Sequence, residues 1–148
     1  MMGGAILVNS LLMLAFGILL FRQSPVKPTV YIRSIRLGIA IFLVAGYFGD
    51  VMVTNAAHSF GAEDGGPCLP ILNWSVETGD LRVAHAFGLH ALQLMPLVGY
   101  LVTRADWPES RQVVTVWVIT IRYAALVYWT YAQALAGRPL IALGASSS

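Results

Sequence analysis

The chain has 148 residues, of which 57% are hydrophobic and 11% are charged, and its formal net charge is +2. Soluble domains carry about 25% charged residues, so the composition excludes an ordinary soluble domain and predicts an integral membrane protein. We expect the lipid bilayer to surround most of the chain, and we expect no nucleic-acid partner.

Four apolar stretches follow one another along the chain, and each is long enough to cross a bilayer. They cover residues 3–21, 35–57, 81–102 and 112–135. A transmembrane helix needs about 20 predominantly apolar residues to cross about 30 Å of hydrocarbon. Residues 1–148 are therefore predicted to form one all-α membrane domain, a bundle of four transmembrane helices that run up-down-up-down.

The charged residues between the stretches predict the orientation of the chain. The second connection, residues 59–79, contains no Lys or Arg. The first and third connections carry the basic residues Arg22, Lys27, Arg33, Arg36, Arg104 and Arg111. Because cytoplasmic loops carry the excess of Lys and Arg, we expect residues 59–79 and both termini on the periplasmic side of a bacterial inner membrane.

The second connection is long for a helical bundle, in which about two to eight residues are usual. Its glycines and prolines prevent either neighbouring helix from continuing through it, and Trp74 favours folding back onto the membrane face. We therefore expect a compact cap, with Asp80 accepting backbone N–H groups at the start of the next helix. Cys68, in this cap, is the only cysteine and has no disulfide partner within the chain.

Arg122 lies near the middle of the last apolar stretch. A guanidinium stays charged, and a charge at that depth costs at least about 2.5–3.5 kcal/mol on insertion scales. Asp50 is the only acidic residue within the four stretches. The sequence therefore predicts a buried ion pair between Asp50 and Arg122.

The other stretches also offer polar side chains. At a helix rise of about 1.5 Å per residue, Asn9, Asp50 and His90 lie about 9–13 Å below the outer boundary. Gln93 shares a helix face with His90, and hydrocarbon offers polar groups no hydrogen bonds. We therefore predict a buried polar cluster that fixes the register of the helices, and its members are Asn9, Asp50, His90, Gln93 and Arg122.

A second interpretation of the polar residues is cofactor binding. His58 follows the second stretch and His85 lies one turn into the third, so both are near the outer boundary. Two such imidazoles can bind haem b axially, or hold a transition metal with Glu63, Asp64 or Asp80. His90 is a third candidate ligand. The sequence has no C-x-x-C-H or H-E-x-x-H motif.

A third interpretation is a proton or solute pathway through Asp50, His90 and Arg122. A bundle of four short helices is narrow, and the chain lacks the inverted repeat of many transporters. No set of nucleophile, base and orienting group is recognisable. The sequence therefore favours a non-catalytic protein.

One block of the sequence resembles a known family. It comprises Gly65-Gly66-Pro67, Leu69-Pro70, Asn73-Trp74-Ser75, Gly79-Asp80-Leu81-Arg82, His85 and Gly88-Leu89-His90-Ala91-Leu92-Gln93, with Gly137-Arg138-Pro139-Leu140 near the C-terminus. The block, GDLRxxH…GLHALQ at its core, resembles one in an uncharacterised family of polytopic bacterial inner-membrane proteins. The resemblance implies that the cap and the third helix form one unit, and it brings no activity or cofactor.

These expectations favour an accessory or assembly-type subunit of a larger membrane complex, with other membrane-protein subunits or further copies of the chain as partners. The alternative is an electron-transfer or sensor protein that binds haem b or a metal through His58, His85 and His90. The second alternative is the pathway through Asp50, His90 and Arg122.

Overall fold

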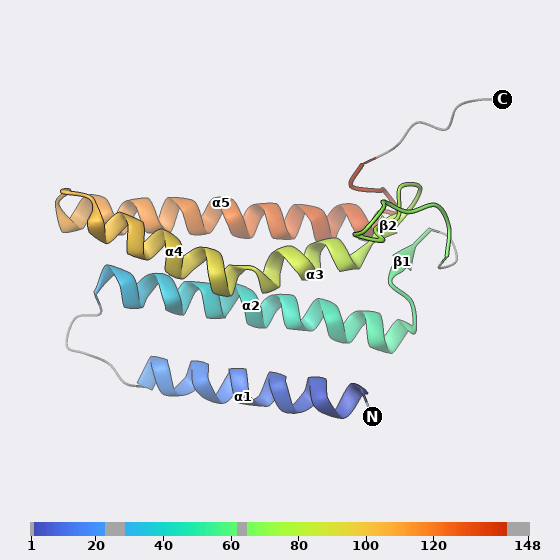
Figure 1. The fold of residues 1–148 in the computed structure, drawn as a ribbon, viewed down its shortest axis with the longest axis horizontal. Helices are drawn as coiled ribbons and strands as arrows, with labels where there is room; N and C mark the ends of the chain where they lie inside the picture. The colour runs from blue at the N-terminus through green and yellow to red at the C-terminus, as the bar shows by residue number, and fades with distance from the viewer. Residues whose placement is uncertain (1, 23–28, 62–64, 142–148) are drawn as a thin grey trace.

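The computed structural model describes residues 2–22, 29–61 and 65–141, which are mainly helical (Figure 1). The helices are α1 (Met2–Arg22), α2 (Val30–Asn55), α3 (Leu81–Leu89), α4 (Ala91–Arg104) and α5 (Glu109–Leu135). Two short antiparallel strands, β1 (Ser59–Phe60) and β2 (Gly79–Asp80), lie between α2 and α3. Helices therefore form where the apolar stretches predict them.

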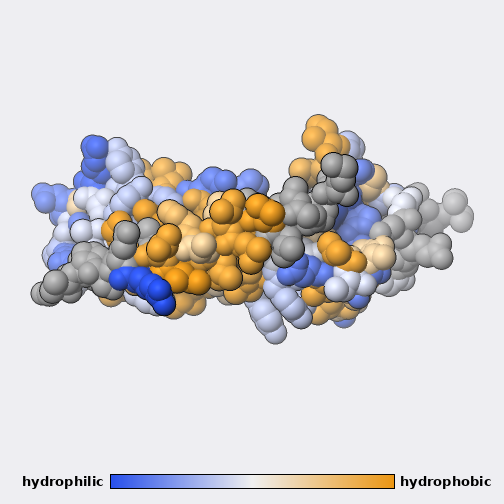
Figure 2. Space-filling view, turned by 90° about the horizontal axis from the view of Figure 1, so that it is seen from below, coloured by the Kyte–Doolittle hydropathy of each residue, from blue (hydrophilic) through white to orange (hydrophobic). Residues whose placement is uncertain are grey.

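Within the described residues, three helical segments are long and apolar enough to cross a membrane. They are Val30–Asn55, Leu81–Arg104 and Glu109–Leu135. Figure 1 shows α2 and α5 running in the same direction, with α3 and α4 running back between them. On the face that Figure 2 shows, hydrophobic side chains gather over the middle of the molecule and hydrophilic ones toward the end with the α4–α5 connection. The middle of this face is therefore the part of the surface that is compatible with contact with lipid.

The helix α2 begins earlier than the apolar stretch predicts. The side chain of Thr29 accepts a hydrogen bond from the backbone N–H of Ile32 (3.3 Å), which satisfies one of the amides left free at a helix start. The helix continues through Arg33 and Arg36 before its long apolar part. The hydropathy pattern marks the apolar part alone, whereas the capping residue determines where the helix starts.

Small residues let α2 and α4 approach closely. A Cβ atom added to Gly38 would lie 2.8 Å from the carbonyl oxygen of Ala91, and one added to Gly99 would overlap the Oγ of Ser34. Ser34 is fully buried, and its hydroxyl donates to the carbonyl oxygen of Tyr31 (2.7 Å). Such small-residue contacts allow the van der Waals packing that holds helices together in lipid.

The helix α5 packs on α2 and α3 through a hydrophobic cluster. Its fully or mostly buried members are Ile41, Ala45, Phe48, Ala84, Ala91 and Val127. Phe48 of α2 stacks on Tyr131 of α5, with ring centroids 4.2 Å apart. A second cluster, nearer the other end of the bundle, contains Val30, Met95, Val102 and Val116. The two clusters fix the heights of α2 and α5 relative to each other.

The segment from Leu81 to Arg104 is interrupted at His90. A proline lacks the N–H group that continues a helix, yet Pro96 lies inside the continuous helix α4. Close contacts with α2 flank the interruption: a Cβ atom at Gly88 would overlap that of Ala45, and the Ala91 carbonyl lies against Gly38. These contacts hold α3 and α4, on the two sides of the interruption, against α2.

The helix α1 lies beside α2 (Figure 1). A Cβ atom at Gly17 would lie 3.2 Å from a methyl group of Ile39, so the two backbones are close at this point. The guanidinium of Arg36 lies over the ring of Phe21, 5.4 Å from its centroid. Contacts between α1 and α2 are thus present at the end of α1 that leads into α2.

The described part of the cap, residues 59–61 and 65–79, lies over the end of α5 (Figure 1). Gly79 has no room for a side chain, because a Cβ atom there would overlap the carbonyl of Ala134. Beyond the last residue of α5, Leu135, Gly137 has a φ of 70° and its N–H donates to the Ala134 carbonyl (2.9 Å), while the Arg138 N–H donates to the Gln133 carbonyl (3.1 Å). This pair of bonds is a Schellman motif. It turns the chain so that Gly137 lies against Phe60 of β1.

Candidate functional site

Asp80 connects the cap to α3. The residue is 3% exposed, and its carboxylate accepts from the backbone N–H of Arg82 (2.9 Å), as the sequence predicts for a capping residue. It also accepts from the backbone N–H of Ser75 in the cap (3.0 Å) and forms an ion pair with the Arg82 guanidinium (2.7 Å). The same guanidinium donates to the carbonyl of Asn73. The cap and α3 therefore share one network of charged hydrogen bonds.

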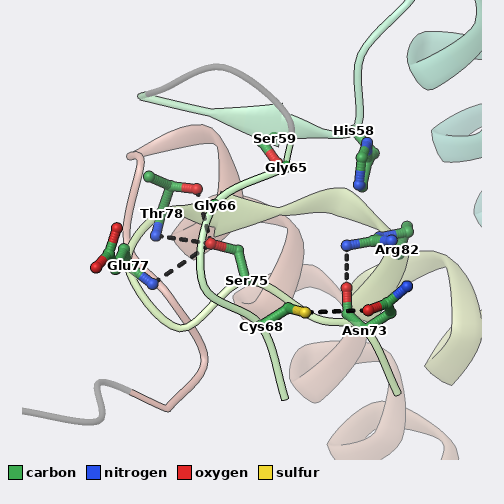
Figure 3. A pocket seen from close by; sticks show the side chains of 10 residues that line it. All are labelled: His58, Ser59, Gly65, Gly66, Cys68, Asn73, Ser75, Glu77, Thr78 and Arg82. Carbon is green, nitrogen blue, oxygen red and sulfur yellow. Dashed lines mark hydrogen bonds between the residues drawn. The ribbon is translucent and has the colours of Figure 1, made fainter. Parts of the chain in front are cut away.

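A polar pocket of about 270 Å³ lies in the cap (Figure 3). Its lining residues are His58, Ser59, Gly65, Gly66, Cys68, Asn73, Ser75, Glu77, Thr78 and Arg82. Figure 3 shows Ser75, Glu77 and Thr78 on one side and His58, Asn73 and Arg82 on the other. Drug-sized ligands usually occupy pockets of about 300–1,000 Å³ lined mainly by apolar groups. The cap pocket is smaller and more polar than that.

The polar groups around the pocket mostly bond one another. The hydroxyl of Ser75 lies 2.9 Å from that of Thr78 and accepts from the Thr78 backbone N–H (3.0 Å). The exposed Cys68 thiol donates to the side-chain oxygen of Asn73 (3.0 Å). An amide oxygen is not a base that activates a thiol. Several polar groups of the pocket are therefore hydrogen-bonded within the cap itself.

The side chains predicted to form a buried polar cluster do not gather inside the single chain, as far as the structure describes them. Asp50, His90, Gln93 and Arg122 are all exposed on the surface of the chain. No hydrogen bond or ion pair joins the side chains of Asp50 and Arg122 to each other. The side chain of Asn9 lies outside the described residues. The prediction assumed that polar stripes turn toward the centre of the chain's own bundle, whereas small and apolar side chains fill that centre.

The heights of the two charges explain why they do not meet. Asp50 follows Phe48 by two residues, and Arg122 precedes Tyr131 by nine. Because Phe48 and Tyr131 stack and their helices run in the same direction, Asp50 and Arg122 are about 16 Å apart along the bundle, at about 1.5 Å per residue. Asp50 and Arg122 are therefore exposed at different heights of the single chain.

Arg122 is the central residue of the 27-residue helix α5. The buried residues of α5 lie on another face of the helix: they are Val116, Thr120, Val127, Thr130 and Ala134. The exposed residues Val118 and Leu126 lie one turn to either side of Arg122. No hydrogen bond or ion pair joins Arg122 to another described residue. A single cation thus stands on an apolar surface at mid-helix.

The three histidines have different surroundings. His58 lines the cap pocket, and His90 is exposed at the α3–α4 junction. The Nδ1 of His85 lies 2.8 Å from the carbonyl oxygen of Ala45 on α2. A carbonyl only accepts, so Nδ1 is the donor in this bond, and in the neutral ring the lone pair is on Nε2. This tautomer is the one that a histidine ligating through Nε2 adopts.

Metal-ligating side chains do not gather elsewhere in the described part of the chain. It contains no group of three or more His, Cys, Asp and Glu side chains placed to hold one ion. Glu63 and Asp64, which the sequence suggested as ligands, lie outside the described residues. Asp80, the third such acid, is occupied by Arg82 and backbone amides.

The network around Asp80 was only partly foreseen. The sequence predicts Asp80 as a helix cap but gives no reason to join it to the cap through Ser75. One feature of the sequence does indicate the ion pair: Arg82 follows Asp80 by two residues at the start of the same helix, so the two side chains can reach each other.

Comparisons with known proteins add no assignment: no protein-family model matches the chain, and neither a curated protein nor a solved structure is found to match it.

Proposed function

We propose that this chain is a non-catalytic integral membrane protein, an accessory or assembly-type subunit of a larger membrane complex. The observation that supports this role best is the exposure of Arg122 at the centre of α5. A charge facing lipid at mid-membrane costs at least about 2.5–3.5 kcal/mol. A neighbouring protein that covers Arg122 removes that cost.

Other exposed polar groups support the same role. Asp50, His90 and Gln93 all lie on the surface of the single chain, within or beside segments apolar enough to cross a membrane. Intramembrane ionisable groups usually face a protein interior or a water-filled cavity. Contacts with other subunits provide such surroundings for residues that this chain does not bury itself.

The proposal includes four membrane passages in a bacterial inner membrane. α1 contributes the first, α2 the second, α3 with α4 the third and α5 the fourth. The basic residues at the α1–α2 and α4–α5 connections favour a cytoplasmic position for both. The cap and the two termini are then periplasmic, and the chain belongs to the membrane-protein family that its GDLRxxH…GLHALQ block resembles.

The test of the subunit role is purification of the full chain at its native expression level. An affinity-tagged chain is extracted from its own host membranes in two mild detergents, and the particles are analysed by native mass spectrometry. We expect a second membrane protein in a fixed ratio in both detergents. A particle that contains this chain alone in both detergents contradicts the role.

A haem- or metal-binding role is the second candidate, and the observation that favours it is the bond from His85 to Ala45. With Nδ1 donating, Nε2 is the nitrogen available to a metal. Protein purified from its host is tested for a Soret band and for iron, copper and zinc. A cofactor in stoichiometric amount that His85→Ala abolishes supports this role, and a colourless, metal-free protein contradicts it.

A further inference from the structure

One face of α5 has the spacing of a helix-packing seam. Val118, Arg122, Ala125 and Trp129 follow steps of four, three and four residues, and Leu126 lies beside them. All five are exposed on the surface of the chain, Trp129 by 54%. Residues repeating at this spacing form the contact surface of two helices that cross at a shallow angle. We call these five residues the Arg122 face.

Arg122 cannot leave the hydrocarbon by bending toward an interface. It is the central residue of α5, so each end of the helix is about 20 Å away at about 1.5 Å per residue. Long basic side chains reach the interface only from positions near helix ends. The charge therefore needs a partner at its own depth.

We infer that the Arg122 face binds a transmembrane helix of a different protein, and that this helix carries an Asp or Glu near the middle of the membrane. The inference rests on the proposed subunit role and adds the chemistry of the partner. A carboxylate can receive the guanidinium in paired hydrogen bonds. The apolar members of the face provide close packing on both sides of that pair.

A second copy of the chain does not supply this carboxylate. Within the four apolar stretches Asp50 is the only acidic residue, and it lies about 16 Å from the height of Arg122, at about 1.5 Å per residue. Because Arg122 is central, a copy in the same orientation and an inverted copy both place their own Arg122 at this depth. Both leave their Asp50 about 16 Å away, so a symmetric pair brings two cations together instead of an ion pair.

A peptide-binding experiment tests the partner chemistry directly. The full chain, labelled at Cys68, is reconstituted in neutral phosphatidylcholine vesicles at pH 7. Energy transfer is measured to polyleucine transmembrane peptides with Glu, Gln or Leu at the central position. We expect roughly tenfold tighter binding of the Glu peptide than of the Leu peptide, with the Gln peptide between them.

Variants of the chain connect this preference to the Arg122 face. Arg122→Leu should remove the preference for Glu, and Ile121→Ala, an exposed neighbour on another face, should keep it. Arg122→Glu should bind a peptide with a central Lys better than the Glu peptide. This reversal tests the inference even if Arg122→Leu fails to fold. Equal binding of the Glu and Leu peptides, or an unchanged preference in Arg122→Leu, overturns the inference.

Self-association is measured in the same vesicles with donor- and acceptor-labelled copies of the chain. Energy transfer between copies that Arg122→Leu abolishes means that a second copy occupies the face, which overturns the inference. The result is separable from the subunit role. If the chain purifies in a native complex but shows no preference for the Glu peptide, the subunit role is retained and this inference is rejected. If the chain purifies alone but prefers the Glu peptide, the subunit role is rejected and this inference is retained.

Discussion

Phe48 of α2 and Tyr131 of α5 stack almost face to face, with ring planes 14° apart and centroids 4.2 Å apart. This contact joins two helices that are distant in the sequence and sets their relative heights. It lies in the hydrophobic cluster that also contains Ala45 and Val127. The stack therefore determines which residues of α2 and α5 meet, and it explains why Asp50 and Arg122 do not.

Phe48→Ala should destabilise the bundle strongly. Phe48 is 4% exposed, so its truncation removes the stack and leaves a cavity, which typically costs about 3–5 kcal/mol for a buried Phe. Tyr47→Ala is the matched control, because Tyr47 is the next residue on the same helix and is 61% exposed. Thermal unfolding in detergent measures both. Equal losses for the two variants mean that the stack does not hold α5 on α2.

Gly99→Ala should weaken the contact between α2 and α4. The added Cβ atom overlaps the Ser34 hydroxyl, and overpacking of this kind costs about 1–3 kcal/mol. Ser34→Gly should recover part of the loss when combined with Gly99→Ala, because it removes the overlapping atom. Gly46→Ala is the control, since a Cβ atom there meets nothing within 4 Å. The same unfolding assay checks the set, and a silent Gly99→Ala contradicts the close approach.

The helices could be predicted from the sequence because hydrophobic length alone marks them. The Asp80 cap was predictable for a similarly local reason, since a carboxylate before an apolar helix satisfies that helix's first amides. The apolar length of a helix and its capping residue are both local features of the sequence, found in or next to the helix that they predict. They need no knowledge of how the helices are rotated.

The orientation of the polar side chains could not be predicted in the same way. Helical phase correctly groups Thr115, Arg122 and Trp129 on one face, but it does not say which face turns inward. On α2, α3 and α4, Gly38, Gly88 and Gly99 let neighbouring backbones approach, so the faces that carry them turn toward the centre. The rule that polar groups avoid lipid does not say whether a polar side chain is covered by its own chain or by another protein. Applied to one chain, the rule predicts Arg122 inside the bundle, whereas Arg122 is exposed on the single chain.

Cys68 offers a direct test of the orientation. It is the only cysteine of the chain and is exposed in the cap. If the cap is periplasmic, a membrane-impermeant maleimide should label Cys68 in intact spheroplasts. In a Cys68→Ser background, Ser110→Cys, which is exposed at the start of α5, should react only after the membrane is opened. The reverse pattern places the cap in the cytoplasm.

Asp80→Ala should loosen the cap from α3. The change leaves the backbone N–H groups of Ser75 and Arg82 and the Arg82 guanidinium without their shared acceptor. Hydrogen bonds to a charged group contribute about 1.5–3 kcal/mol, and we expect a loss near the lower end because the Arg82 side chain is 33% exposed. Thermal unfolding of the purified protein measures this loss.

Asp80→Asn and Glu77→Gln separate the two parts of the Asp80 network. Asparagine still caps a helix but has a single acceptor oxygen, so Asp80→Asn should keep the bond from the Arg82 N–H, lose the ion pair and the bond from the Ser75 N–H, and destabilise less than Asp80→Ala. Glu77 is exposed and its side chain is not part of the network, so Glu77→Gln should be silent. Limited proteolysis of the cap should follow the same order, because the bonds to Ser75 and Asn73 hold the cap on α3. If Asp80→Ala leaves both stability and proteolysis unchanged, the cap is held by its contacts with Ala134 and Gly137 of the α5 end instead.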